Sequence, residues 1–180
     1  MTITELKSKW NKEKDSYIKK EIGDGTQKFV KDILECPDIF NLKEGLNSTP
    51  LEKRKYEFKE EEVKKAARHA DIVIFINPEI AIPIEVERYK NIKAGEQQII
   101  QYQLDYNENN SKRCGILTDG YSWRFYNNNE YREFTLKEIF DKTELFLEFW
   151  QEYIKPESYY LAFLKKRAEV FIKRSGNFKC

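Results

Sequence analysis

The amino-acid sequence predicts an α/β fold, in which a mixed central sheet of about four strands is flanked by helices. Three observations support this prediction. Short β-branched apolar runs separated by turn residues fill the middle of the chain, between residues 71 and 127. Apolar residues at helical spacing precede and follow that block. A helical segment also separates the second strand from the third, which is typical of a crossover connection.

Residues 4–36 are predicted to be mostly helical. In their second half, apolar side chains recur with a period of about 3.6 residues, at Phe29, Val30, Ile33 and Leu34. Gly23-Asp24-Gly25 is predicted to break the helix, and Thr26 to cap the part that follows. After a loop at residues 47–50, residues 51–70 are expected to begin irregular and then turn helical.

A β-hairpin is predicted next. Its strands are Asp71–Ile76 (DIVIFI) and Ile80–Glu87 (IAIPIEVE), and Asn77-Pro78-Glu79 forms the turn. So short a connection makes the two strands antiparallel.

The crossover helix is predicted at Gly95–Tyr106. Its apolar side is expected to carry Ile99, Ile100 and Leu104. The third strand follows at Gly115–Thr118 (GILT).

The fourth strand is predicted at Ser122–Asn127 (SWRFYN), after a turn at Asp119-Gly120. Trp123 and Phe125 are interpreted as core residues of this strand, because a sheet packed against helices needs large apolar side chains. The tail from Thr135 onward, rich in Phe and Tyr, is predicted to be helical and to pack on the sheet.

The composition excludes several classes of protein. A chain of 180 residues suffices for one domain with its own core. A net charge of +1 shows no commitment of the whole chain to nucleic acid, and the basic run Lys59–Ala70 is interpreted as a solvated helix face. No apolar run approaches the ~18 residues of a membrane helix, so no membrane partner is expected.

Cysteine and histidine restrict the chemistry further. Cys36, Cys114 and Cys180 fit neither a disulfide framework nor a zinc site, which favours a reducing cytoplasm. His69, the single histidine, excludes His-rich metal sites and is expected to have a structural role.

Two glutamates occupy the second predicted strand. Because side chains alternate along a strand, Glu85 and Glu87 face the same side. If the turn centres on Pro78, antiparallel pairing places Asp71 opposite Glu85. Three acids at one end of a sheet repel one another unless a cation joins them, and a hard divalent cation is the natural partner. The alternative is an exposed strand edge, with acids that are solvated or paired with Arg88 and Lys90.

These residues resemble a known family. Asp71, thirteen intervening residues and then Glu85-Val86-Glu87 resemble the core motif of the PD-(D/E)xK nuclease superfamily, with an Asp on the second core strand and acid-x-Lys on the third. Gln98-Ile99-Ile100-Gln101-Tyr102 is similar to the Q-x-x-x-Y helix motif of several branches, including the nuclease domains of type I restriction motor subunits. GILTDGYSWRFY, Gly115–Tyr126, resembles the strand-turn-strand that follows that helix. The resemblance covers residues 71–126 and implies a restriction-endonuclease-like fold.

The resemblance implies a role for each acid. Asp71 and Glu85 would ligate Mg²⁺, for which Mn²⁺ is expected to substitute. Glu87 would take the third catalytic position, as a further metal ligand or as the base. Because Glu87 replaces the usual Lys of the family, the role of that Lys in polarising water or stabilising the transition state is open. Lys90 is the nearest candidate, although at three residues along a strand it faces the opposite side unless the chain bends.

The resemblance also implies residues outside the acidic motif. Gln98 and Tyr102, four apart on one helix face, would contact the DNA backbone together with Lys90, or orient the active site. The alternative is a plain helix surface, with Tyr102 as a buried edge. Family members carry a further acid on the first helix, for which Glu21 is the choice and Glu35 the second candidate.

The predicted function is therefore that of a Mg²⁺-dependent endonuclease domain that hydrolyses DNA, as the cleavage module of a restriction-modification enzyme. Since the charge is near neutral, the expected partners are double-stranded DNA and the recognition, methyltransferase or translocase domains of the same polypeptide or complex. Dimerisation on DNA is expected, because cutting both strands takes two sites. The alternatives are a catalytically inactive nuclease fold that binds DNA or docks a protein, and a plain interaction domain with a chance motif match.

Residues 1–180 are expected to be a single nuclease-like domain, an N-terminal fragment of a longer protein. Residues 71–126 are its motif-bearing core, and residues 135–180 its helical tail.

Overall fold

The computed structural model describes residues 1–45, 55–64, 68–77, 80–106 and 113–155. Within these residues, one mixed sheet contains seven strands, which follow each other in chain order. They are β1 (Lys43–Glu44), β2 (Glu57–Lys64), β3 (Arg68–Asn77), β4 (Ile80–Val86), β5 (Cys114–Thr118), β6 (Ser122–Asn127) and β7 (Glu130–Thr135). The fold is thus α/β, as predicted, with a larger sheet than the four strands expected.

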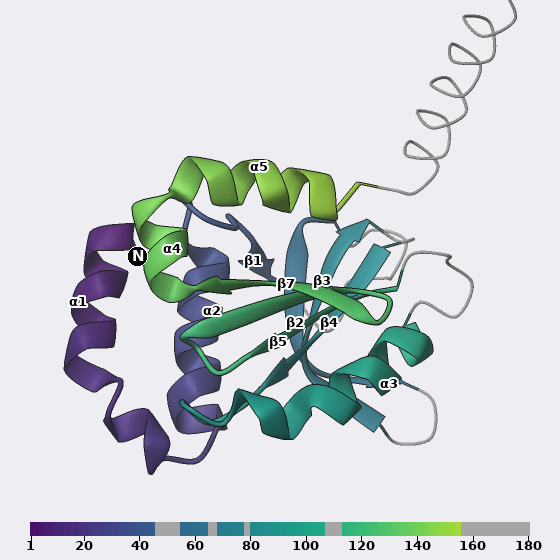
Figure 1. Cartoon of the computed structure of the whole chain (residues 1–180), viewed down its shortest axis with the longest axis horizontal. Coiled ribbons are helices and arrows are strands. Elements are labelled where there is room, and N and C mark those ends of the chain that lie inside the picture. The colour runs from purple at the N-terminus through teal and green to yellow at the C-terminus, as the bar shows by residue number, and fades with distance from the viewer. Residues whose placement is uncertain (46–54, 65–67, 78–79, 107–112, 156–180) are drawn as a thin grey trace, which may run out of the picture.

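The sheet is flanked by α-helices on both faces (Figure 1). They are α1 (Ile3–Glu13), α2 (Lys28–Glu35), α3 (Glu96–Tyr106), α4 (Leu136–Asp141) and α5 (Thr143–Tyr153). None of these helices in the described part of the chain combines the length and apolar composition that spanning a membrane requires.

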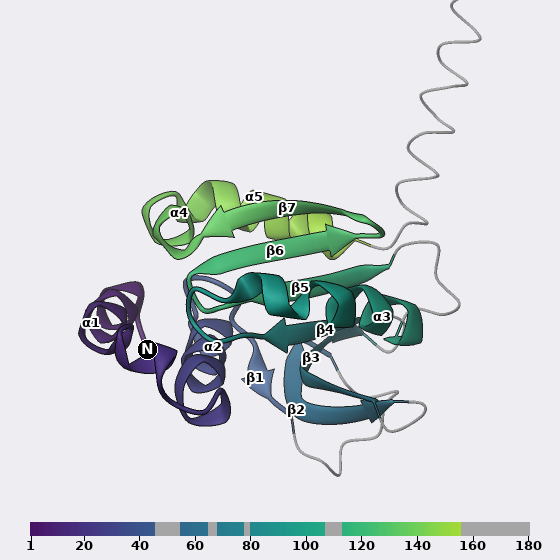
Figure 2. The ribbon, with the colours of Figure 1, turned by 60° about the horizontal axis from the view of Figure 1, so that its bottom comes forward.

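Strand directions follow from the connections. β2, β3 and β4 are antiparallel neighbours, as are β5, β6 and β7. β4 and β5 run parallel, because α3 carries the chain across one face of the sheet between them (Figure 2). The predicted hairpin and crossover are therefore confirmed, although residues 78–79 of its turn lie outside the described residues.

Three strands of the sheet were not predicted, namely the two-residue strand β1, β2 and β7. The expectation of helix within residues 51–70 is wrong for residues 57–64, which form β2, and for residues 68–70, which begin β3. The two strands pair from Glu57↔Phe75 to Lys64↔Arg68. The segment EFKEEEVK is rich in helix-forming residues, but pairing with β3 and the complete burial of Phe58 override that preference. β7 escaped notice because it is an edge strand whose side chains are exposed apart from Phe134 and, in part, Thr135.

The predicted break between α1 and α2 takes a different form. Gly23–Gln27 is a π-helical turn that continues directly into α2. The prediction that Thr26 caps α2 is wrong, because the backbone is already helical there. Its hydroxyl is buried and makes no hydrogen bond with the described residues.

The main hydrophobic core lies on the face of the sheet that packs against α1, α2, α4 and α5. Trp123 and Phe125 are both buried there, as predicted. The Phe125 ring contacts aromatic rings of α5, with centroids 5.7 Å from Phe146 and 5.5 Å from Tyr153. The helical tail thus packs on the sheet as predicted over residues 136–153, and residues 156–180 lie outside the described part.

The opposite face is covered by α3. Tyr102 and Tyr106 belong to the cluster that contains Val73 of β3, and Ile99 to the cluster that contains Leu117 of β5. The helix is thus rotated relative to the prediction, because tyrosines provide much of its buried stripe. Ile100 and Leu104, predicted on the apolar side, are 40% and 37% exposed.

Candidate active site

The acidic residues meet where β3 begins and β4 ends. The register pairs Ile72 with Ile84, so Asp71 stands opposite Glu85, as predicted. The Asp71 Oδ2 atom accepts a hydrogen bond of 2.8 Å from the backbone N–H of Val86. This hydrogen bond ties the carboxylate of one strand to the backbone of the next and limits its rotation.

The two glutamates are buried beneath the start of α3. Glu85 is only 6% exposed and Glu87 only 8%. A Cβ atom added to Gly95 would stand 3.0 Å from both Glu85 Cγ and Glu87 Oε1, and 2.5 Å from Leu117 Cδ1. Glycine at position 95 therefore allows the chain to pass directly over the two carboxyl groups, and a side chain there would displace them.

Burial and mutual repulsion change the acidity of these groups. Burial, followed by the charges of Asp71 and Glu87, raises the pKa of Glu85 to about 8. Burial and then the Asp71 charge also raise the pKa of Glu87, which the charge of Arg88 opposes. Without a cation, Glu85 is therefore mostly protonated at neutral pH.

The donor set suits a hard cation only in part. Among the described residues, no group of three or more His, Cys, Asp and Glu side chains is arranged to hold a metal ion. Mg²⁺ commonly takes only one or two carboxylates and completes its shell with waters and phosphate oxygens. Asp71 and Glu85, whose charges act on each other, fit that smaller requirement.

Gln98 and Tyr102, the two site residues predicted on α3, differ in their exposure to solvent. Gln98 is exposed, whereas Tyr102 is 8% exposed and packs in the cluster with Val73 and Phe75. Tyr102 thus matches the alternative of a buried edge. A DNA contact by Gln98 stays a prediction.

Glu21 and Glu35, the two candidates for the further acid, lie at opposite ends of the segment formed by the π-helical turn and α2. Glu21 lies just before the π-helical turn, with its Oε2 atom 3.6 Å from a guanidinium nitrogen of Arg88, the residue after Glu87. Its side chain is 84% exposed. Glu35, at the far end of α2, is also exposed. Of the two, Glu21 is the one brought to the end of β4.

The chain bends after β4, as a role for Lys90 required. Lys90 has a φ of 69°, and its N–H donates a 2.9 Å hydrogen bond to Asp119. Its Nζ atom lies over the Tyr89 ring, 5.2 Å from the centroid. Because the Tyr89 ring packs against Trp10 of the main core, the bend carries the Lys90 ammonium group toward α1.

Sequence reasoning missed two polar residues near the acids. Gln27, at the end of the π-helical turn, is buried and donates from Nε2 to the backbone oxygen of Asp71 at 3.4 Å. Lys59 of β2 is buried and pairs with Val73, so it lies on the same face of the sheet as Asp71. The alternation along β2 would have revealed Lys59, had the segment been recognised as a strand.

Comparison with models of protein families, with curated proteins and with solved structures gives no match for this chain.

Proposed function

We propose that this chain is a Mg²⁺-dependent endonuclease domain that hydrolyses DNA phosphodiester bonds. The observation that carries the proposal is the pair Asp71 and Glu85, which lie on adjacent strands with Glu85 buried and its pKa raised to about 8. Holding acids together away from water costs free energy, which a divalent cation offsets. Buried carboxyl groups whose pKa is shifted in this way are typical of functional sites.

Each acid has a defined part in this proposal. Asp71, oriented by the Val86 N–H, and Glu85 would hold the cation. When bound, Mg²⁺ would supply Lewis acidity to the phosphate and lower the pKa of a water molecule. Glu87, two residues along the same face, would accept the proton of the attacking water or add a further ligand.

Lys59 is our candidate for the cationic role that Glu87 cannot fill. It is buried on the acids' face, and its position on β2 is diagonal to Asp71 across the β2–β3 pair. A long side chain spans such a diagonal. An ammonium group there would stabilise charge that develops on the phosphate during hydrolysis.

Near-neutral charge supports the view that this domain works with DNA-recognition or translocase domains of the same polypeptide or complex. Double-stranded DNA is the proposed substrate, and dimerisation on DNA would place a site on each strand.

The experiment measures Mn²⁺ binding by calorimetry and Mg²⁺-dependent cleavage of plasmid DNA, for the wild type, Asp71→Asn, Glu85→Gln and Lys59→Met. Removing either acid should weaken Mn²⁺ binding and cleavage by about 100-fold, the upper end of effects around metal sites. Lys59→Met should lower cleavage while Mn²⁺ still binds. Glu35→Gln, an exposed acid at the far end of α2, is the control. Wild-type affinity and cleavage in Glu85→Gln would refute the proposal.

A catalytically inactive nuclease fold, used for DNA binding or protein docking, is the second candidate. One observation favours it: Glu87 stands where the nuclease superfamily that the motif resembles has Lys. It predicts no cleavage under any metal condition and unchanged DNA binding in Glu85→Ala.

A further inference from the structure

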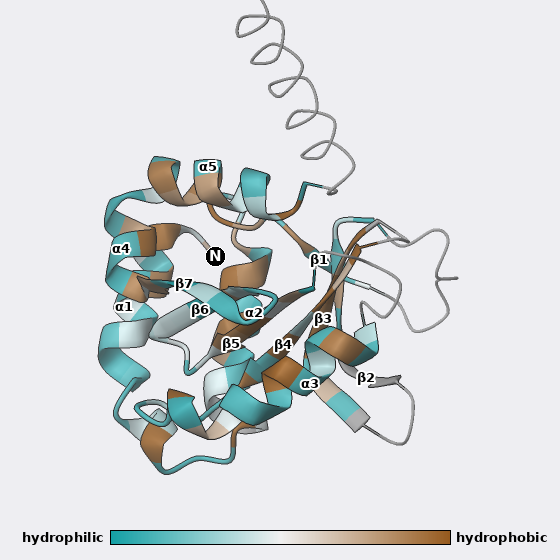
Figure 3. Cartoon of the chain, turned by 45° about the vertical axis from the view of Figure 1, so that its right-hand side comes forward, coloured by the Kyte–Doolittle hydropathy of each residue, from teal (hydrophilic) through white to brown (hydrophobic). Residues whose placement is uncertain are grey.

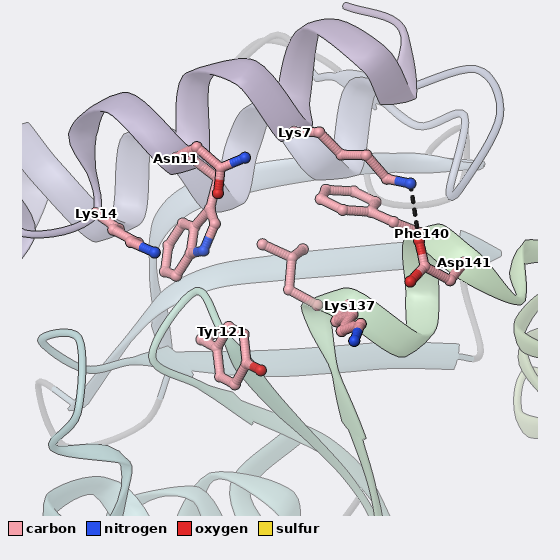
Figure 4. Close-up of a pocket in the computed structure, with 9 residues that line it drawn as sticks. Lys7, Asn11, Lys14, Tyr121, Lys137, Phe140 and Asp141 are labelled. Atoms are coloured by element: carbon pink, nitrogen blue, oxygen red, sulfur yellow. Dashed lines mark hydrogen bonds and ion pairs between the residues drawn. The ribbon is translucent and has the colours of Figure 1, made fainter.

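A pocket of about 270 Å³ opens between α1, the start of α4 and the turn that joins β5 to β6 (Figure 4). Its floor is apolar, since Trp10, Leu136 and Phe140 line it and are almost fully buried. Tyr121 forms one wall, and its ring stacks on Trp10 with centroids 5.9 Å apart and an interplanar angle of 18°. The pocket thus offers flat aromatic surface beside an opening to solvent.

The rim of this pocket is basic. Lys7, Lys14 and Lys137 line it, against a single carboxylate, Asp141. Lys7 is neutralised by Asp141, with Nζ 2.8 Å from Oδ1. Among the described residues, neither Lys14 nor Lys137 has an ion-pair partner, so two positive charges face the opening. Asn11 adds a neutral group that both donates and accepts hydrogen bonds.

We propose that this pocket binds one nucleotide of a DNA strand. The phosphate would lie between Lys14 and Lys137, and the sugar and base against Tyr121 and the apolar floor. Lysines bind phosphate as point charges, and aromatic rings stack bases without regard to sequence. The volume lies just below the roughly 300–1,000 Å³ of typical ligand pockets, which suits a single nucleotide.

The pocket and the acidic site both lie near the ends of β4 and β5, on opposite faces of the sheet. Tyr89, two residues after Glu87, contacts the pocket floor through Trp10, with ring centroids 5.0 Å apart. Tyr121 follows β5, whose last residue, Thr118, pairs with Val86 of β4. Because the pocket lies on the face that packs against α1 and α4 and the acids lie on the α3 face, a DNA strand bound in the pocket would pass around this end of the sheet to reach the acids. The assignment of the ligand as a DNA nucleotide rests on the proposed function. Binding of a nucleotide in the pocket requires neither metal nor cleavage.

The test is an NMR titration of the full chain with thymidine 5′-monophosphate, without divalent metal, following the tryptophan indole N–H signals. The Trp10 signal, assigned with Trp10→Phe, should move, and that of Trp150, on the buried side of α5, should not. Lys14→Ala/Lys137→Ala should weaken binding by about tenfold or more, because both phosphate contacts are lost. Lys12→Ala/Lys142→Ala, which removes the same charge from α1 and the end of α4 outside the pocket, should bind as the wild type does.

Several results would overturn the pocket proposal. They are an unmoved Trp10 signal, equal weakening in both double variants, equally tight binding of inorganic phosphate, and tighter binding of a pentaglutamate peptide. Asp71→Asn should retain nucleotide binding. A chain that binds the nucleotide but never cleaves DNA would refute only the nuclease, and a chain that cleaves DNA without moving Trp10 would refute only the pocket.

Discussion

The two faces of the sheet bury different kinds of side chain. The face beneath α1, α2, α4 and α5 is filled by aliphatic and aromatic side chains, whereas the face beneath α3 also buries charge. Figure 3 shows hydrophobic and hydrophilic residues alternating along α3. On that second face, Arg124 is neutralised by Glu96 at 2.6 Å and Glu133 at 2.7 Å. Burial, and then the charge of Asp71, instead raise the pKa of Glu85 and of Glu87. The comparison separates a face that is filled by apolar side chains from one that also holds buried ionisable groups.

The largest expected effect belongs to the apolar face. Phe125→Ala should lower the free energy of unfolding by about 3–5 kcal/mol, because it leaves a cavity among the rings of α5. Urea unfolding followed by circular dichroism measures this loss. Leu145→Ala, 58% exposed on α5, is the control and should change it by under about 0.5 kcal/mol. A loss below about 1 kcal/mol for Phe125→Ala would mean that this face is loosely packed.

A smaller effect is expected on the α3 face, and it depends on pH. Glu85 has a pKa of about 8 when folded and about 4.5 when unfolded, so the folded chain binds more protons between these values. The free energy of unfolding should therefore fall as the pH rises from about 5 to about 8. Glu85→Gln cannot ionise and should lack this part of the fall, making it roughly 2–4 kcal/mol more stable relative to wild type at pH 8.5 than at pH 5.

Urea unfolding at both pH values, in metal-free buffer, measures this difference. Glu148→Gln, an exposed glutamate of α5, should follow the wild-type profile. Parallel pH profiles for Glu85→Gln and the wild type would show that Glu85 is not buried as described.

The smallest effect is expected on the outer side of α3. Leu104→Gln should change the free energy of unfolding by under about 1 kcal/mol, because Leu104 already exposes 37% of its surface to solvent. Ile99→Ala, on the buried side of the same helix, should cost about 2–4 kcal/mol. Thermal unfolding of the two variants compares them directly, and equal losses would place α3 in the orientation that its aliphatic residues suggest.

The sequence predicts those parts of the structure that depend on local patterns. The hairpin and the meeting of Asp71 with Glu85 follow from side-chain alternation and a short turn. The position of Lys59 could not be predicted from local patterns, because the residues around it favour a helix and form a strand only by pairing with β3. The pocket was also beyond prediction, since Lys14 and Lys137 meet only through packing of α1 near α4.

Neighbouring strands of the sheet are also neighbours in the chain, and only the β4–β5 pair joins the two three-stranded units β2–β4 and β5–β7. Chains rich in such local contacts fold rapidly, since little loop entropy is lost before contacts form. Asp71 and Glu85 belong to the first unit, and Glu87 directly follows its last strand. We therefore expect the carboxyl groups to come together while still hydrated, and to lose their water only when α3 and β5 dock. Pulsed hydrogen exchange during refolding, with protection of β3 preceding that of β5, would reveal this order.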